Sequence, residues 1–175
     1  MRELRLARDL VRTCCCTPRL RLPVDLSAIC RHLGCTVRAL DIPDYDGCHL
    51  RLNGTGRPLI LLGTNLHRHR KRFTLAHEIG HIALGHAPSR FDGEHLIEAR
   101  ARWQESQADR FASELLMPWP AMRQLGLMSV EAISARFCVS PAAAACRAQQ
   151  VGWTRARTRR AIADDAAAQL DALGL

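Results

Sequence analysis

Residues 72–81, RFTLAHEIGH, constrain the fold more than any other stretch, because they place two imidazoles and a carboxylate on one apolar helix. His77 and His81 are four residues apart, so they share one helix face and can offer two ring nitrogens to a single metal ion. Glu78 is rotated by about 100° from His77 and cannot easily join them, but it can reach a water on the open side of the ion. The third ligand has to come from elsewhere in the chain.

One candidate for the third ligand is His86. Its register is one residue short of the HExxHxxGxxH spacing in which metalloproteases use a downstream histidine, so the helix would have to break at Gly85. The stronger candidate is Glu105, in the next helical segment, WQESQADRFASELLMP, on the edge of an apolar stripe. Two imidazoles and one carboxylate suit Zn²⁺ and leave a fourth position for water, which is the ligand set of an open catalytic site.

Asp109 follows Glu105 by four residues and shares its helix face. We expect it to accept the free N–H of a ligand histidine, most naturally His77, and so to fix the tautomer of that ring. The alternative is that Glu105 and Asp109 are surface acids that pair with Arg102 and Arg110. With zinc at this site, Glu78 is expected to be the general base of a metal-assisted hydrolysis.

The hydrophobic period predicts an α+β fold. Helices are expected at 3–16, 26–33, 65–84 and 94–117, with two shorter ones within 129–151, and strands at 35–40, 47–52 and 58–62. Asn53-Gly54 predicts a hairpin between the last two strands. We therefore expect one domain over residues 1–152, in which a small, three-stranded, mostly antiparallel sheet packs on a helical bundle carrying the HExxH helix and the second ligand helix. Residues 153–175 are expected to form a basic, Ala-rich helical tail.

The formal charge of the 175-residue chain is +8, and Lys71 is the only lysine. Arginine forks suit phosphate oxygens, so the two basic clusters are candidate nucleic-acid contacts, with solvated surface as the alternative. Their members are Arg68, Arg70, Lys71 and Arg72 in the first cluster and Arg155, Arg157, Arg159 and Arg160 in the second. No stretch is apolar enough to suggest a membrane span or a secretory leader, which predicts a cytoplasmic protein. The sequence does not predict the oligomeric state.

Eight cysteines are present without any CxxC pair, and reduced, structural thiols are the expected reading. A thiolate is also a strong zinc ligand, so Cys48, Cys14, Cys15 and Cys16 are candidate inhibitory thiols that would fill the open metal position. Tyr45 and His49 are candidate oxyanion donors. An extended peptide substrate needs an edge strand, and the alternating segment GCHLRL (47–52) is the preferred one over PLILL.

Three separated blocks resemble the ImmA/IrrE family of intracellular zinc metallopeptidases: RFTLAHEIGHIALGH, ESQADRFASELLMP and ISARFCVSPAAAACRAQQVG, with the resemblance covering roughly residues 23–152. The resemblance implies His77, His81 and Glu105 as ligands of one zinc ion, Glu78 as catalytic carboxylate and Asp109 at the family's Asp or Asn position. It also implies a protease that cuts a helix-turn-helix repressor, encoded nearby, in a stress, DNA-damage or anti-phage operon. The cysteine run 14–16 and the arginine-rich tail depart from the family pattern.

A competing interpretation is a DNA-binding transcriptional regulator with a structural metal site. EAISARFCVSPAAAACRAQQVG has the pattern of a helix-turn-helix, but its second helix carries few side chains that read base edges. A protein that only binds DNA also has no use for the Glu78 carboxylate beside a metal ion. A third interpretation combines the two: single-stranded DNA activates the protease through the basic clusters.

Overall fold

A computed structural model describes residues 1–16, 20–41, 46–52, 56–87, 98–126 and 129–152. For residues 98–101 it describes the backbone alone. The order of the described elements is α1 (Arg2–Cys15), α2 (Leu26–His32), β1 (Thr36–Leu40), β2 (Gly47–Arg51), β3 (Pro58–Gly63), α3 (Arg68–Leu84), α4 (Glu98–Leu116), α5 (Trp119–Gln124), α6 (Val130–Phe137) and α7 (Pro141–Gln150). The predicted α+β class is confirmed. The predicted tail, 153–175, lies outside the described residues.

The sheet is mixed. Strand β3 lies in the centre, pairs antiparallel with β2 as the predicted hairpin requires, and pairs parallel with β1. The expectation of a mostly antiparallel sheet is therefore corrected by the β1–β3 pair. Strand β2 takes one edge of β3 through the hairpin, so β1 can pair only with the opposite edge. There it runs in the same direction as β3.

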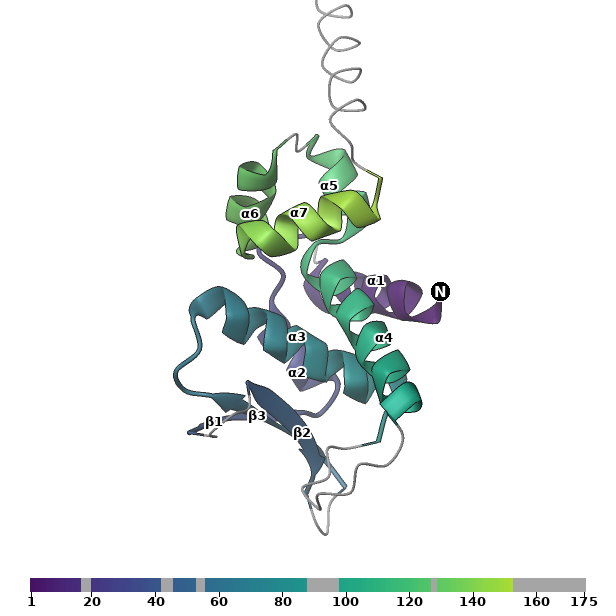
Figure 1. Ribbon diagram of the computed structural model, residues 1–175, viewed down its shortest axis with the longest axis vertical. Coiled ribbons are helices and arrows are strands. Elements are labelled where there is room, and N and C mark those ends of the chain that lie inside the picture. Colours follow the sequence, from purple (N-terminus) through teal and green to yellow (C-terminus); the bar gives the residue numbers. More distant parts are fainter. Residues whose placement is uncertain (17–19, 42–45, 53–55, 88–97, 127–128, 153–175) are drawn as a thin grey trace, which may run out of the picture.

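Helix α3 lies on one face of the sheet (Figure 1). His49 pairs with Ile60, and Gly47 with Leu62, so these four residues share a face of the antiparallel pair. A methyl group on Gly47 would lie 2.7 Å from Thr74 Cγ2 and 2.9 Å from Leu61 O, so only glycine lets β2 approach α3 this closely. That face therefore carries His49 toward the HExxH helix.

Helices α3 and α4 pack side by side at the centre of the molecule (Figure 1). Their contact is close at Gly80, where a Cβ would lie 2.9 Å from Phe111 Cδ1 and 3.3 Å from Ala108 Cα. Ile79 and Leu115 are fully buried in the same core. The glycine within HEIGH thus sets the spacing at which α4 can bring its carboxylates to the histidines of α3.

Helices α5, α6 and α7 gather on the side of α3 opposite the sheet (Figure 1). Glu114, which is 1% exposed, ties this group to α4 and to α1. It accepts a hydrogen bond of 2.7 Å from Arg8 Nε and one of 3.1 Å from the backbone N–H of Trp119, and it forms an ion pair with the buried Arg147 of α7. Arg147 Nε also donates to Met117 O at 3.2 Å. A buried carboxylate with this many partners fixes where α7 lies.

Candidate metal centre

The side chains of His77, His81 and Glu105 converge. One ligand atom from each lies within 4.8 Å of the others, and this is the single such group of three or more histidine, cysteine or acidic residues within the described parts of the chain. The Nε2 atoms of His77 and His81 are 2.9 Å apart, and Glu105 Oε2 lies 3.0 Å from His77 Nε2. Tetrahedral zinc with Zn–N bonds of about 2.0–2.1 Å needs nitrogens about 3.3 Å apart, so a small rotation of either ring would complete the site.

The hydrogen bonds on the far side of each ring fix its tautomer. Asp109 Oδ1 lies 2.8 Å from His77 Nδ1, and because a carboxylate only accepts, His77 Nδ1 carries a proton and directs its Nε2 lone pair inward. This is the contact expected of Asp109. Its carboxylate is more than half exposed, so it reaches His77 from the rim of the site.

His86 has a role that the sequence did not predict. Its Nε2 lies 3.2 Å from Gln107 Oε1, an acceptor, so Nε2 carries the proton and Nδ1 accepts from His81 Nδ1–H at 3.0 Å. Burial lowers the pKa of His86, which keeps the ring neutral. The chain ends α3 at Gly85 with φ +75°, and this left-handed turn brings His86 back beside His81. His86 is therefore placed as a partner of a ligand rather than as the third ligand.

The resulting arrangement requires a cation. With both Nδ1 atoms protonated, two Nε2 lone pairs and a carboxylate face one another, which is repulsive unless a metal ion or a proton lies between them. In the metal-free site, burial lowers the pKa of His77, but hydrogen bonds to Asp109 and Glu105 outweigh it and raise that pKa to about 9. Hydrogen bonds to His77 and His81 lower the pKa of Glu105, which stays ionised. The donors therefore fit a divalent metal ion.

Glu78 is buried beside this group and is held by β2. His49 Nδ1 lies 3.0 Å from Glu78 Oε2, so His49 donates and orients the carboxylate. The His49 ring also stacks on the His81 ring, with centroids 5.3 Å apart. Its Nε2 is buried and has no partner among the described residues. The structure thus brings His49 to the site through Glu78, while Tyr45, the other candidate oxyanion donor, lies outside the described residues.

The candidate inhibitory thiols do not join the donor group. Side chains alternate along a strand, so with His49 facing α3, Cys48 lies on the opposite face of the sheet. Burial, followed by the charge of Glu78, raises the pKa of the Cys48 thiol. Cys14, Cys15 and Cys16 lie at the end of α1 and pack against the core, with Cys15 Sγ donating to Asp25 O. Burial raises the pKa of Cys14 and Cys15 as well, which disfavours the thiolate form.

The first basic cluster lies at the start of α3, and three of its members contact the protein. Arg70 Nε donates to Asp46 Oδ2 at 2.5 Å, Lys71 Nζ to Thr64 O at 3.3 Å, and the half-buried Arg72 to Val24 O at 2.6 Å. Arg68 is exposed. Arg155, Arg157, Arg159 and Arg160 lie outside the described residues. The cluster is therefore largely engaged in holding α3 against its neighbours.

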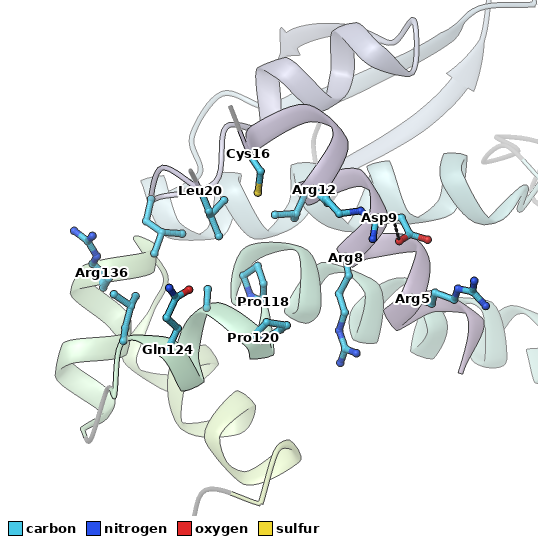
Figure 2. A pocket seen from close by; sticks show the side chains of 14 residues that line it. Arg5, Arg8, Asp9, Arg12, Cys16, Leu20, Pro118, Pro120, Gln124 and Arg136 are labelled. Atoms are coloured by element: carbon cyan, nitrogen blue, oxygen red, sulfur yellow. Dashed lines mark hydrogen bonds and ion pairs between the residues drawn. The ribbon is translucent and has the colours of Figure 1, made fainter. Parts of the chain in front are cut away.

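A basic cavity of about 970 Å³ lies away from the metal centre, between α1 and the α5–α6 region (Figure 2). Arg5, Arg8 and Arg12 reach it from α1 and Arg136 from α6, with Asp9 paired to Arg12 at 3.0 Å. Its remaining wall, as far as the described residues form it, is mostly apolar and carries no aromatic ring. Arg68, Arg70, Lys71 and Arg72 of the first basic cluster do not line it.

The helix-turn-helix pattern is confirmed as two helices, α6 and α7, but α7 is not a free helix. Arg147 is 3% exposed and bonds to Glu114 and Met117 O, so the one cation of α7 points into the protein. The side chains that α7 leaves exposed are those of Pro141, Ala142, Ala145, Cys146, Gln149 and Gln150. The glutamines, which can bond to base edges, lie at the C-terminal end of α7, whereas a recognition helix reads bases with its N-terminal residues, which here are proline and alanine. This packing favours a structural role for the helix pair.

Comparison with known proteins assigns the family. Residues 30–149 match the model of the IrrE N-terminal-like domain, peptidase family M78, and the chain belongs to this family. A search among curated proteins finds no match. A solved structure titled Mycobacterium tuberculosis transcriptional regulator has the same fold, with a TM-score of 0.54 and 19% identity; the match covers 83% of this chain and 45% of that one. This chain thus spans less than half of that protein. The family is a peptidase family, and among the described residues His77, His81 and Glu105 form a candidate metal site.

One further finding concerns membranes. Among the residues that the structure describes, none of the helices combines the length and the apolar character needed to cross a bilayer.

Proposed function

We propose that this chain is a zinc-dependent endopeptidase that cleaves a helix-turn-helix repressor encoded nearby, and so derepresses a stress or defence operon. The observation that carries the peptidase part is the placement of a buried carboxylate, Glu78, beside three converging metal donors. A structural zinc site has no need of an additional carboxylate that is held in place by its own hydrogen bond. The repressor as substrate follows from the resemblance to the ImmA/IrrE family.

His77, His81 and Glu105 would hold the zinc ion. When bound, it supplies a water of lowered pKa and polarises the carbonyl of the scissile bond. Glu78 acts as the base: His49 holds Oε2, which leaves Oε1 to take the proton of the attacking water and to return it to the leaving amine. Asp109 and His86 hold the Nδ1–H groups of both histidines, so that each Nε2 is directed inward, where it can offer its lone pair to the ion.

The substrate would bind along β2. This strand is one of the two edges of the sheet, so it has unpaired backbone groups that an extended peptide can meet by adding a strand. Its residue His49 lies against Glu78, which places this edge next to the catalytic base. Strand β3, which contains PLILL, is central and has no free edge. The strand order therefore supports residues 47–52 as the platform for the substrate.

A trigger is also proposed: single-stranded DNA activates the protease through exposed arginines, because the net charge is +8. The test combines purified zinc-loaded protein with the repressor encoded beside it, with and without an oligonucleotide at low salt. Cleavage that requires the oligonucleotide supports both substrate and trigger. Cleavage that is indifferent to it removes the trigger and keeps the substrate, and no cleavage of this repressor under either condition contradicts the proposed substrate.

A further inference from the structure

A cavity of about 420 Å³ opens beside the metal centre, between α3, α4 and α7. The residues that line it include Phe73 on α3, Asp109 and Ser113 on α4, Val139 in the turn before α7 and Ala143 in the first turn of α7. The volume lies in the range of pockets that bind small organic groups. No part of the proposed chemistry uses it.

The cavity is continuous with the site through both ligand helices. Asp109 lines it and also bonds to the ligand His77 at 2.8 Å. Phe73 lies one helical turn before His77, and Ser113 one turn after Asp109, so both face the same side of their helices as the residues that build the site. The cavity therefore shares Asp109 with the metal centre and lies one helical turn from His77, between α3, α4 and α7.

The chemistry of the cavity fits an apolar group. Phe73, Val139 and Ala143 give its wall apolar surface, and most of the surface that faces the cavity is apolar. The other lining residues carry polar side chains: His67, His69, Arg70, Asp109, Ser113, Ser140, Cys146 and Gln150. Histidine and cysteine could suggest a second metal site, but within the described residues the only donor group is the one around His77. A cavity with a mostly apolar wall, next to a reacting centre, suits a substrate side chain.

We propose that this cavity is a specificity pocket that accepts one bulky apolar side chain, of the size of leucine, methionine or phenylalanine, next to the scissile peptide bond. The inference rests on the proposed peptidase function and adds a substrate class to it. It also gives the α6–α7 pair a role, because α7, held by the buried Arg147–Glu114 ion pair, forms the wall opposite α3.

The test uses the zinc-loaded full chain and two pairs of hydroxamates, since a hydroxamate binds zinc without needing turnover. In each pair, one compound carries an isobutyl group next to the zinc-binding group, and the other carries a hydrogen at the same position. This position is on the amino side of the zinc-binding group in one pair and on the carboxyl side in the other. In one pair, the isobutyl compound should bind the wild type roughly tenfold or more tightly than its partner, as expected for burial of a leucine side chain.

Ala143→Trp fills the cavity and should reduce that ratio to about one. Ala143→Leu, a smaller change, should reduce it partly and serves if the tryptophan variant does not fold. Ala145→Trp, on an exposed position of the same helix, is the matched control and should keep the wild-type ratio. The proposal would be overturned if the wild type bound the two hydroxamates of each pair with equal affinity. It would also be overturned if both Ala143 variants kept the wild-type ratio of affinities.

The outcome is separable from the failure of the proposed function. A chain that discriminates between the hydroxamates but cleaves no peptide would contradict the peptidase and keep the apolar pocket. A chain that cleaves peptides with no preference for bulky apolar residues near the cut, and binds the hydroxamates of each pair equally, would keep the peptidase and contradict the pocket.

Discussion

The affinity of the site for zinc should depend steeply on pH between 7 and 9, because His77 holds a proton that zinc must displace. Burial opposes that proton, but Asp109 and Glu105 raise the pKa of His77 to about 9. A raised pKa means that the metal-free protein binds the proton below pH 9 and loses it above. Apparent zinc affinity should therefore rise with pH and level off near 9.

The magnitude follows from the fraction of neutral His77. With a pKa of about 9, this fraction, and with it the apparent affinity, increases about ninefold from pH 7 to pH 8. An unperturbed histidine with a pKa of about 6.5 would give an increase of only about 1.3-fold over the same interval. The same proton stabilises the metal-free fold: its contribution is fully present below pH 6.5 and is lost as the pH rises through 9.

The assay is a competition titration against a zinc-binding indicator of known pH dependence, repeated from pH 6.5 to 9.5. Asp109→Asn is the control variant, since it keeps a hydrogen-bond acceptor but removes the charge, and its profile should shift toward lower pH. Isothermal titration in buffers of different ionisation enthalpy should show about one proton released from His77 per zinc near pH 7. A zinc affinity that is flat from pH 7 to 9 would refute the reasoning.

Three further predictions concern single substitutions. His86→Ala removes the acceptor of His81 Nδ1–H and should weaken zinc binding by roughly 10–100-fold, as measured by the same competition; an unchanged affinity would deny His86 its orienting role. Gly80→Ala places a methyl group against Phe111 and should destabilise the fold by about 1–3 kcal/mol in urea unfolding, whereas full stability would mean that α4 can move away at no cost. Glu114→Gln leaves Arg147 buried without its charge partner and should cost about 3–5 kcal/mol; a change below about 1 kcal/mol would show that the ion pair does not fix α7.

The order of elements could be predicted from the sequence because period and end signals agree along the chain. Asp25 caps α2 by accepting from Ser27 N and Ala28 N, and Gly85 ends α3, as their positions indicate. Helix α5 is not among the predicted helices: it begins two residues after the predicted helix 94–117 ends, and Pro120 lies in its first turn. The β1–β3 pairing was also missed, because strand order depends on packing rather than on local pattern.

The metal donors could be predicted because the i, i+4 rule acts within single helices. The contacts that orient them could not. His86 reaches His81 only through the left-handed turn at Gly85, and Gln107 joins it from another helix. Gly80 in HEIGH was a visible signal for close helix packing, but the sequence does not identify Phe111 and Ala108 as the residues it meets.

We propose that Glu78 performs proton transfer at a zinc centre that cuts peptide bonds. The most direct measurement compares wild type and Glu78→Gln, both loaded with zinc to the same stoichiometry, for new peptide termini detected by mass spectrometry in the neighbouring repressor. We predict zinc-dependent cleavage by the wild type and a rate roughly 10²–10⁴-fold lower in the variant, with equal zinc content. Equal cleavage by both proteins, or a wild type that carries zinc and cuts no peptide bond, would contradict the account.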